Sequence, residues 1–317
     1  DAIVLFRLGD FYEMFGEDAE KASKILQIAL TTRDKSREDP IPMCGVPYFA
    51  ADSYILKLIK AGLKVAICEQ MEDPREAKGI VERDIVRVIT PGTYTPDNPK
   101  ENVYIISIFP SGDKHGIALS DISTGEFIMY ETHDNIQDEV YRFEPREILI
   151  PQSIQSDIHY QEAFHHFFVS VYEDWYFDYA DAYKTLLQHL KVSSLEGYGC
   201  DGMNAAISAA GALVNYLQET QKETFTLKKI STLRSDSHMF LDATTQRNLE
   251  LTHNLTSGST EETLLWVLDE TLTPMGGRFL RSSIMKPLID INEIKQRIDA
   301  VEYLTDDFEL LEELRTS

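Results

Sequence analysis

Apolar positions recur at strand and helix spacings along the first hundred residues. Short continuous runs indicate strands, and apolar residues three or four apart indicate helices. The expected elements are strands over 3–6, 64–68 and 85–89, the last one buried, and helices over 16–29, 52–62 and 74–79. The first helix should extend its apolar stripe to Ala29, and Asp52 should cap the second. Between them, Pro42, Gly45 and Pro47 predict a turn-rich loop.

The next stretch begins with three strand-like runs, joined by segments of hairpin composition. Helices and strands then alternate. We expect strands over 104–109, 115–121, 127–130, 147–150 and 169–172, and helices over 136–143, 179–190 and 203–221. A meander followed by parallel strands and helices is typical of a ribonuclease-H-like domain.

From about Leu241 onward the pattern is helical throughout. Asp242 and Asp290 each precede an apolar helical repeat, and Thr273-Pro274 suits the first turn of another helix. The helix after Asp242 should contain Leu249 and Leu251. The fold class is therefore α/β, with a partial all-α segment at the end. We divide the chain into a mixed α/β domain over 1–95, a linker over 96–102, a ribonuclease-H-like domain over 103–228 and a helical segment over 229–317.

Composition fits two or three soluble domains. The chain has 317 residues, 43% of them hydrophobic, and no apolar run approaches the roughly 20 residues that span a bilayer. Three scattered cysteines favour a reducing, cytoplasmic setting over a disulfide framework. The first residues include neither an initiating Met nor a basic segment, so we expect a truncated start rather than a signal peptide.

The net charge of −23 argues against extensive contact with nucleic acid, but the charge is unevenly distributed. Residues 1–100 hold 14 Lys and Arg against 17 Asp and Glu, whereas residues 101–240 hold 9 against 21 and residues 241–317 hold 7 against 15. The first hundred residues are therefore the expected DNA reader, and we expect the chain by itself to bind DNA weakly.

The run Gly9-Asp10-Phe11-Tyr12-Glu13-Met14-Phe15 is unusual for a core strand, since three aromatic residues surround one carboxylate. Phe11 and Glu13 are two positions apart, so an extended backbone would present both on one face. A ring and a carboxylate that approach one target together are typical of proteins that probe unstacked bases. The alternative is ordinary: a buried strand phenylalanine beside a solvated glutamate.

Three segments decide between these alternatives. They read FRLGDFYEMFGEDA, IPMCGVPYFAADSYILKLIKAGLKVAICEQMEDP and VRVITPGT, and their order and spacing resemble the N-terminal part of the MutS family of DNA mismatch-recognition proteins. The likeness continues through LSDISTGEF and LDATTQRNLELTHNL to LTPMGGRFLRSSIMKPL, and so covers nearly the whole chain. It implies that Phe11 and Glu13 meet a mispaired base, that 103–228 is a connector domain and that the final helices begin a lever.

Deformability supplies a mechanism for recognising any mispair. A mispair is poorly stacked, so inserting Phe11 and kinking the duplex there costs less than at a paired step. Glu13 would accept a hydrogen bond from a base N–H, or donate one as the neutral acid if desolvation and nearby phosphates raise its pKa. Its repulsion from normal DNA would add selectivity.

Four further residues are candidates for positions close to DNA. Arg33, Lys35 and Arg37 lie in a polar loop and either contact phosphates or are merely solvated. The resemblance implies that the loop containing Met43 lies near the motif strand, where Met43 either lines the groove or is buried.

Two other functions compete with mismatch recognition. In the first, Asp121 lies near the position of a metal-binding aspartate in ribonuclease-H-like nucleases, but no second and third carboxylate are evident. In the second, the acidic residues 101–240 form a docking module for proteins. His165-His166 should point apart and lie on the surface, so we expect no metal site there. The aromatic residues within 172–177 should pack against a neighbouring domain.

No phosphate-binding GxxxxGK[ST] run occurs in the sequence, so we expect no catalytic activity, metal or cofactor here. The resemblance implies that the full-length protein is an ATPase that uses ATP and magnesium, forms a homodimer on mismatched double-stranded DNA and contacts other mismatch-repair proteins through the connector domain.

Overall fold

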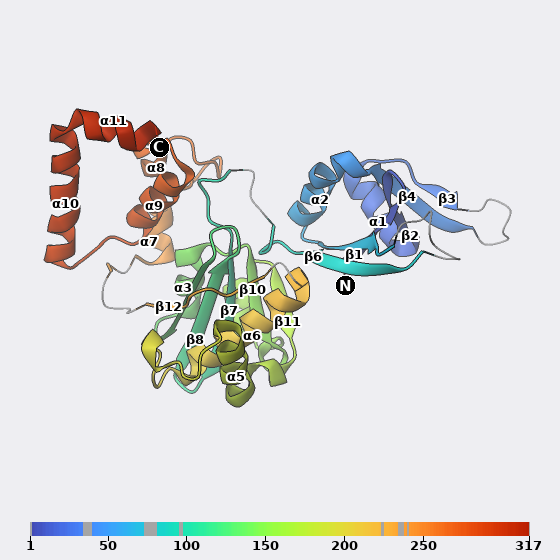
Figure 1. Cartoon of the computed structure of the whole chain (residues 1–317), viewed down its shortest axis with the longest axis horizontal. Helices are drawn as coiled ribbons and strands as arrows, with labels where there is room; N and C mark the ends of the chain where they lie inside the picture. Colours follow the sequence, from blue (N-terminus) through green and yellow to red (C-terminus); the bar gives the residue numbers. More distant parts are fainter. Residues whose placement is uncertain are drawn as a thin grey trace.

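The computed structural model describes residues 2–33, 40–72, 81–94, 98–222, 225–233, 238–239 and 241–316. Two six-stranded sheets, each with its own helices, are followed by a helical segment (Figure 1). This is the α/β class expected from the sequence.

The first sheet has the strand order β3-β4-β2-β1-β5-β6. Its strands are β1 (Ala2–Leu8), β2 (Phe11–Phe15), β3 (Thr31–Arg33), β4 (Ile41–Pro47), β5 (Lys64–Gln70) and β6 (Arg83–Ile89). β1 and β5 are parallel and the other pairs are antiparallel. The expected strands are all present. The expectation of a buried third strand is only partly met, because β6 is an edge strand in which only Ile89 is fully buried.

The predicted turn-rich loop is wrong, because this segment forms β4 and pairs with both β2 and β3. Cys44 and Val46 alternate into the core, and their burial outweighs the turn composition. Pro47 ends the strand, a position where a missing N–H is tolerated.

Two helices, α1 (Gly16–Leu26) and α2 (Ala51–Lys60), pack on one face of this sheet; the 3-10 turn η1 (Tyr48–Ala50) precedes α2. α1 ends earlier than predicted, since Gln27 adopts a left-handed conformation and Ala29 is exposed beyond the helix. Asp52 lies in the first turn of α2 rather than at its cap, where Ala50 makes no side-chain hydrogen bond. The predicted helix over 74–79 falls outside the described residues.

The second sheet has the order β11-β10-β7-β8-β9-β12. Its strands are β7 (Tyr104–Ser111), β8 (Lys114–Asp121), β9 (Glu126–Thr132), β10 (Glu147–Pro151), β11 (Val169–Tyr172) and β12 (Ser231–Thr232). β7, β8 and β9 form the predicted antiparallel meander, and β10 and β11 join in parallel. This is the ribonuclease-H-like arrangement that the sequence predicted.

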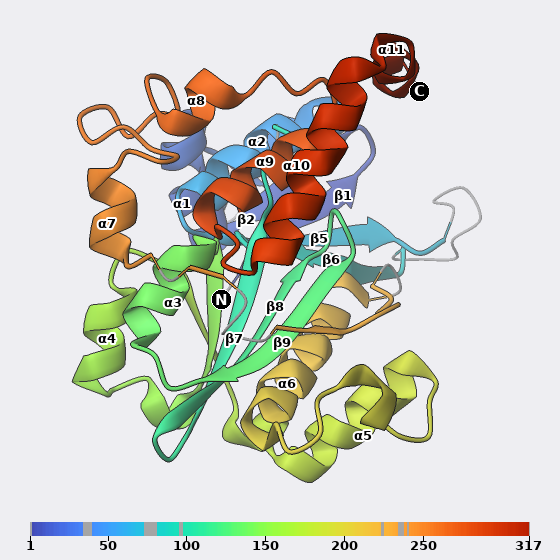
Figure 2. The ribbon, with the colours of Figure 1, turned by 90° about the vertical axis from the view of Figure 1, so that its left-hand side faces the viewer.

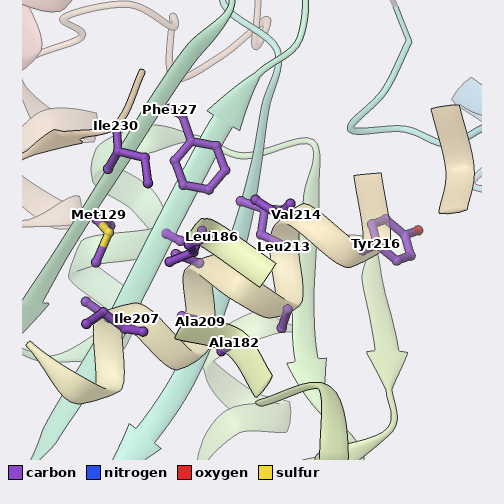
Figure 3. Close-up of a cluster of buried hydrophobic side chains, with 14 of the residues drawn as sticks. Phe127, Met129, Ala182, Leu186, Ile207, Ala209, Leu213, Val214, Tyr216 and Ile230 are labelled. Carbon is purple, nitrogen blue, oxygen red and sulfur yellow. The ribbon is translucent and has the colours of Figure 1, made fainter. Parts of the chain in front are cut away.

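Helices cover both faces of the second sheet (Figure 2). They are α3 (Ile136–Phe143), α4 (Ile158–Phe164), α5 (Tyr179–Leu190) and α6 (Asn204–Gln221), with 3-10 turns η2 (Gln152–Ile154), η3 (Asp174–Phe177) and η4 (Glu196–Tyr198). α3, α5 and α6 match the expected positions, whereas α4 was not predicted. α6 lies between the sheet and α5, and its Ile207, Leu213 and Val214 belong to one buried cluster with side chains from both (Figure 3).

The helical segment contains α7 (Ala243–Asn248), α8 (Leu264–Leu268), α9 (Pro274–Met285), α10 (Ile291–Asp306) and α11 (Phe308–Thr316). Asp290 caps α10 as predicted, and the helices expected after Asp242 and at Thr273-Pro274 are also present. Asp242 and Thr273 cap them, each side chain accepting a hydrogen bond from a backbone N–H. α7 is shorter than expected, so Leu249 and Leu251 lie beyond it. Within the described ranges, no helix is long and apolar enough to cross a membrane.

Candidate nucleic-acid interface

The strand β2 places Phe11 and Glu13 on one face of the first sheet, as predicted. Tyr12 and Met14 point the other way, into the core beneath α1 and α2. Phe11 is 48% exposed, whereas Glu13 is half-buried. The ordinary alternative of a buried strand phenylalanine is therefore wrong. β2 is buried on the face that packs against the helices, and it presents the Phe11 ring and the Glu13 carboxylate on the opposite face, here called the front face.

The turn before Phe11 is fixed from both sides. Gly9 adopts a φ of +60°, a conformation that a residue with a side chain rarely takes. The Asp10 carbonyl accepts a hydrogen bond of 2.8 Å from the Tyr48 N–H, and the Gly9 carbonyl accepts one of 2.6 Å from Arg7 Nε. The first bond joins the β1–β2 turn to η1 and the second joins the turn to β1, so Phe11 leaves the sheet from a constrained backbone.

Tyr12 secures the back of the strand. Its hydroxyl donates a hydrogen bond to Glu69 on β5, two strands away. Burial and this bond raise the pKa of Tyr12 above its usual range, so the hydroxyl stays protonated and keeps donating. The polar tip of a core residue thus fixes the position of β2 relative to β5.

Strand register gives the neighbours of Glu13 on the front face. Glu13 lies across from Phe6 on β1 and Gly45 on β4. A Cβ at Gly45 would lie 3.3 Å from the Tyr12 carbonyl oxygen, which is a tight contact, and 3.5 Å from Glu13 Cγ, which is an ordinary one. Phe6 and Phe15 contact each other with ring centroids 5.8 Å apart. Glu13 is therefore a carboxylate whose neighbours on this face include the ring of Phe6.

The other predicted residues are placed unevenly. Met43 lies across from Phe15 and is half-buried. Arg33 ends β3, and the structure does not describe its side chain. Lys35 and Arg37 lie outside the described residues.

Sequence reasoning missed three residues beside the turn: Arg7, Tyr48 and Phe49. The Arg7 guanidinium lies over the Tyr48 ring, with Cζ 3.3 Å from the ring centroid, and Phe49 is 87% exposed. The dipeptide Tyr48-Phe49 after Pro47 was a visible signal. Its position beside Arg7, however, follows from strand pairing and not from sequence spacing.

Asp121, the residue of the nuclease alternative, is fully buried and already satisfied. Oδ2 accepts a 2.8 Å hydrogen bond from Asn102 Nδ2, and Oδ1 accepts bonds from the backbone N–H and hydroxyl of Ser123. Across the part of the chain that the structure describes, no three His, Cys, Asp or Glu residues are grouped to hold a metal ion. Asp121 therefore stabilises the β8–β9 turn and the start of β7.

Two minor predictions need correction. The rings of His165 and His166 do not point apart, because their centroids are 3.5 Å from each other; both residues are exposed, as expected. Tyr172 and Tyr176 stack on each other, and Tyr172 meets Tyr216 of α6 edge-on. These aromatics pack within the second domain rather than against a neighbouring one.

Family profiles agree with this architecture. MutS domain I matches residues 1–98, MutS domain II matches 103–231 and MutS domain III matches 244–317. Three successive matches define a multidomain protein with a mixed α/β first domain, a ribonuclease-H-like second domain and a helical third part. The chain belongs to the MutS family.

Curated relatives support this assignment. The DNA mismatch repair protein MutS of Thermodesulfovibrio yellowstonii is 56% identical over 315 residues, which are 99% of this chain and 36% of the relative. The protein of the same name from Lachnoclostridium phytofermentans is 44% identical over 99% of this chain and 35% of the relative. That from Methanococcoides burtonii is 42% identical over 100% and 37%. The chain thus spans little more than a third of the length of these relatives.

Proposed function

We propose that the first domain recognises mispaired or unpaired bases in duplex DNA, at the start of DNA mismatch repair. Phe11 wedges at the mispair and Glu13 hydrogen-bonds the base. The observation that carries this proposal is the half-exposed Phe11 ring on a strand fixed from behind by Tyr12, with Glu13 on the same face. Relatives named for DNA mismatch repair support it.

The wedge selects through the energy of deformation. Inserting a side chain between base pairs unstacks a step and costs a few kcal/mol, and this cost is lower where pairing is already imperfect. A rigid backbone at Phe11 favours such selection. A mobile ring could turn aside from paired DNA at little cost in free energy, whereas a fixed ring must unstack the paired step.

Glu13 adds a test of the freed base edge. As a carboxylate it accepts a hydrogen bond from a base N–H, and as the neutral acid it donates one to a purine nitrogen. A paired base offers neither group in the right place, so the carboxylate approaches normal DNA without compensation.

The remaining assignments concern the intact protein. We propose that residues 1–95 form the mismatch-binding domain, 103–228 the connector that contacts other mismatch-repair proteins, and 229–317 the start of the lever. The intact protein would be a cytoplasmic homodimer that uses ATP and magnesium elsewhere in its sequence, and the present chain would be non-catalytic. Arg33, Lys35, Arg37 and Met43 remain proposed neighbours of the DNA.

Substitution of Phe11 in the full-length protein tests the wedge. Phe11→Ala should lower affinity for a duplex with one mismatch by about 10-fold or more, because a base–aromatic stack contributes roughly 1–3 kcal/mol. Affinity for the matched duplex should barely change, so the ratio of the two falls towards one. Glu13→Ala should lower the ratio of mismatched to matched affinity, chiefly by strengthening binding to the matched duplex.

Fluorescence anisotropy with two duplexes that differ at a single base pair gives both affinities. Ile158→Ala is the matched control, since Ile158 is 65% exposed on α4 of the second domain. An unchanged ratio in Phe11→Ala would refute the wedge. Weaker binding of Glu13→Ala to matched DNA would refute the proposed repulsion between Glu13 and paired DNA.

A further inference from the structure

The turn cluster is defined as Arg7, Tyr48 and Phe49. Two of its residues hold the β1–β2 turn, but the wedge mechanism does not use the exposed rings or the terminal N–H groups of Arg7. Phe49 is 87% exposed and Tyr48 50%. Exposure of an aromatic ring to water is unfavourable, and a partner that covers the ring removes this cost. The cluster therefore has the character of a contact surface.

Strand pairing places the cluster at the same end of the sheet as Phe11. Phe11 pairs with Leu8 on one side and Pro47 on the other, and Tyr48 and Phe49 follow directly after Pro47. Arg7 pairs with Tyr12, so its side chain leaves the face opposite to Phe11. Phe11 and the turn cluster thus lie on opposite faces at one end of the sheet, with the β1–β2 turn between them.

The charge of the cluster favours an anionic partner. Arg7 Cζ lies over the Tyr48 ring, 3.3 Å from its centroid, and Arg7 Nε donates to the Gly9 carbonyl. Among the described residues no carboxylate forms an ion pair with Arg7 or with Arg83, whose Nε donates to the Arg7 carbonyl at 3.5 Å. A guanidinium held on a ring keeps its terminal N–H groups available to phosphate.

We propose that the turn cluster is a second contact with the same DNA duplex, in which Phe49 packs against a deoxyribose and Arg7 binds a phosphate. This inference rests on the proposed function, because a duplex reaches this end of the sheet only if Phe11 contacts DNA as proposed. Contacts to sugar and phosphate set position and are indifferent to base pairing. The cluster holds the duplex against the end of the sheet, and Phe11 then tests it.

The experiment uses the full-length protein with the matched and mismatched duplexes. Phe49→Ala should weaken binding to both duplexes by a similar factor of about 10, because a ring that is buried on binding contributes roughly 1.5–3 kcal/mol, so the ratio of the two affinities stays unchanged. Arg7→Gln should reduce the slope of log affinity against log salt by about one for both duplexes, because one phosphate contact is lost. Arg7→Lys should restore that slope, which a purely structural role for Arg7 would not predict.

The outcomes separate this inference from the wedge. Affinities within twofold of the parent in Phe49→Ala would overturn it, even where Phe11→Ala abolishes discrimination as proposed. A fall confined to the mismatched duplex would also overturn it, since Phe49 would then be a second wedge. A change in oligomeric state without a change in affinity, measured by analytical ultracentrifugation, would assign the cluster to contacts between protein copies instead.

Discussion

At the scale of single residues, the surroundings of Lys286 change its protonation. Lys286 follows α9, and its Nζ lies 3.9 Å from the centroid of the Phe143 ring. Burial, reinforced by the charge of Arg142, lowers the pKa of Lys286 to about 8. An unfolded lysine titrates near 10.4. The folded chain therefore releases the Lys286 proton at a lower pH than the unfolded chain does.

This difference in pKa predicts how stability depends on pH. Between about pH 8 and 10.4 the unfolded chain binds more protons at Lys286 than the folded chain, so this residue makes folding more favourable as the pH rises. Relative to Lys286→Met, the melting temperature of the parent chain should increase from pH 7 to pH 10. Scanning calorimetry measures both, with the exposed Lys184→Met as control. Parallel curves for the parent and Lys286→Met would contradict the assignment.

At the scale of elements, local patterns predicted most strands and helices, and long-range pairing explains the exceptions. The β7–β9 meander and the caps Asp242 and Asp290 follow from alternation and capping chemistry. β4 did not, because the burial of alternate residues between two partner strands outweighs its turn composition. The two-residue period of a strand was enough to predict that Phe11 and Glu13 lie on one face. The contact of Arg7 with Tyr48 could not be predicted in this way, because it depends on the pairing of β4 with β2.

The packing of α6 on β8 depends on a glycine. A Cβ at Gly116 would lie 2.0 Å from the backbone carbonyl of Ala205, at the start of α6. Gly116→Ala should therefore reduce the free energy of unfolding by about 3 kcal/mol or more, as overpacking forces helix and sheet apart. Gly197→Ala is the control, because a Cβ there meets nothing within 4 Å. Urea denaturation compares the two, and equal stabilities would show that α6 can shift at little cost.

At the scale of the whole molecule, a buried carboxylate joins the first two domains. Glu147, at the start of β10, accepts hydrogen bonds from Thr90 Oγ1 and the Gly92 N–H, both of which follow β6. It also accepts a 2.6 Å bond from the Tyr216 hydroxyl on α6, which in turn accepts one of 3.1 Å from Lys64 on β5. Segments of both domains therefore share one set of buried polar bonds.

Removing one hydroxyl should loosen this junction. Tyr216→Phe leaves Glu147 and Lys64 without a shared partner and should reduce the free energy of unfolding by about 2 kcal/mol. Amide exchange at Gly92 should become faster, since its N–H donates to Glu147 at 3.1 Å. Tyr183→Phe is the control, because the Tyr183 hydroxyl accepts a bond from Leu195 within the second domain. Unchanged exchange at Gly92 would show that the junction does not depend on Tyr216.

The helix α6 belongs to both domains. Its first turn is bound to the sheet of the second domain, where the Ala205 N–H donates to Glu131 at 2.8 Å. At its other end Gln221 accepts a 2.9 Å bond from Arg87 and donates one of 3.0 Å to the Val88 carbonyl, both on β6. If the first domain binds DNA as proposed, a duplex that bends would exert a torque on β6 and therefore on the C-terminal end of α6. Because α6 packs in the core of the second domain, that torque would reach this core without any contact between the second domain and the DNA.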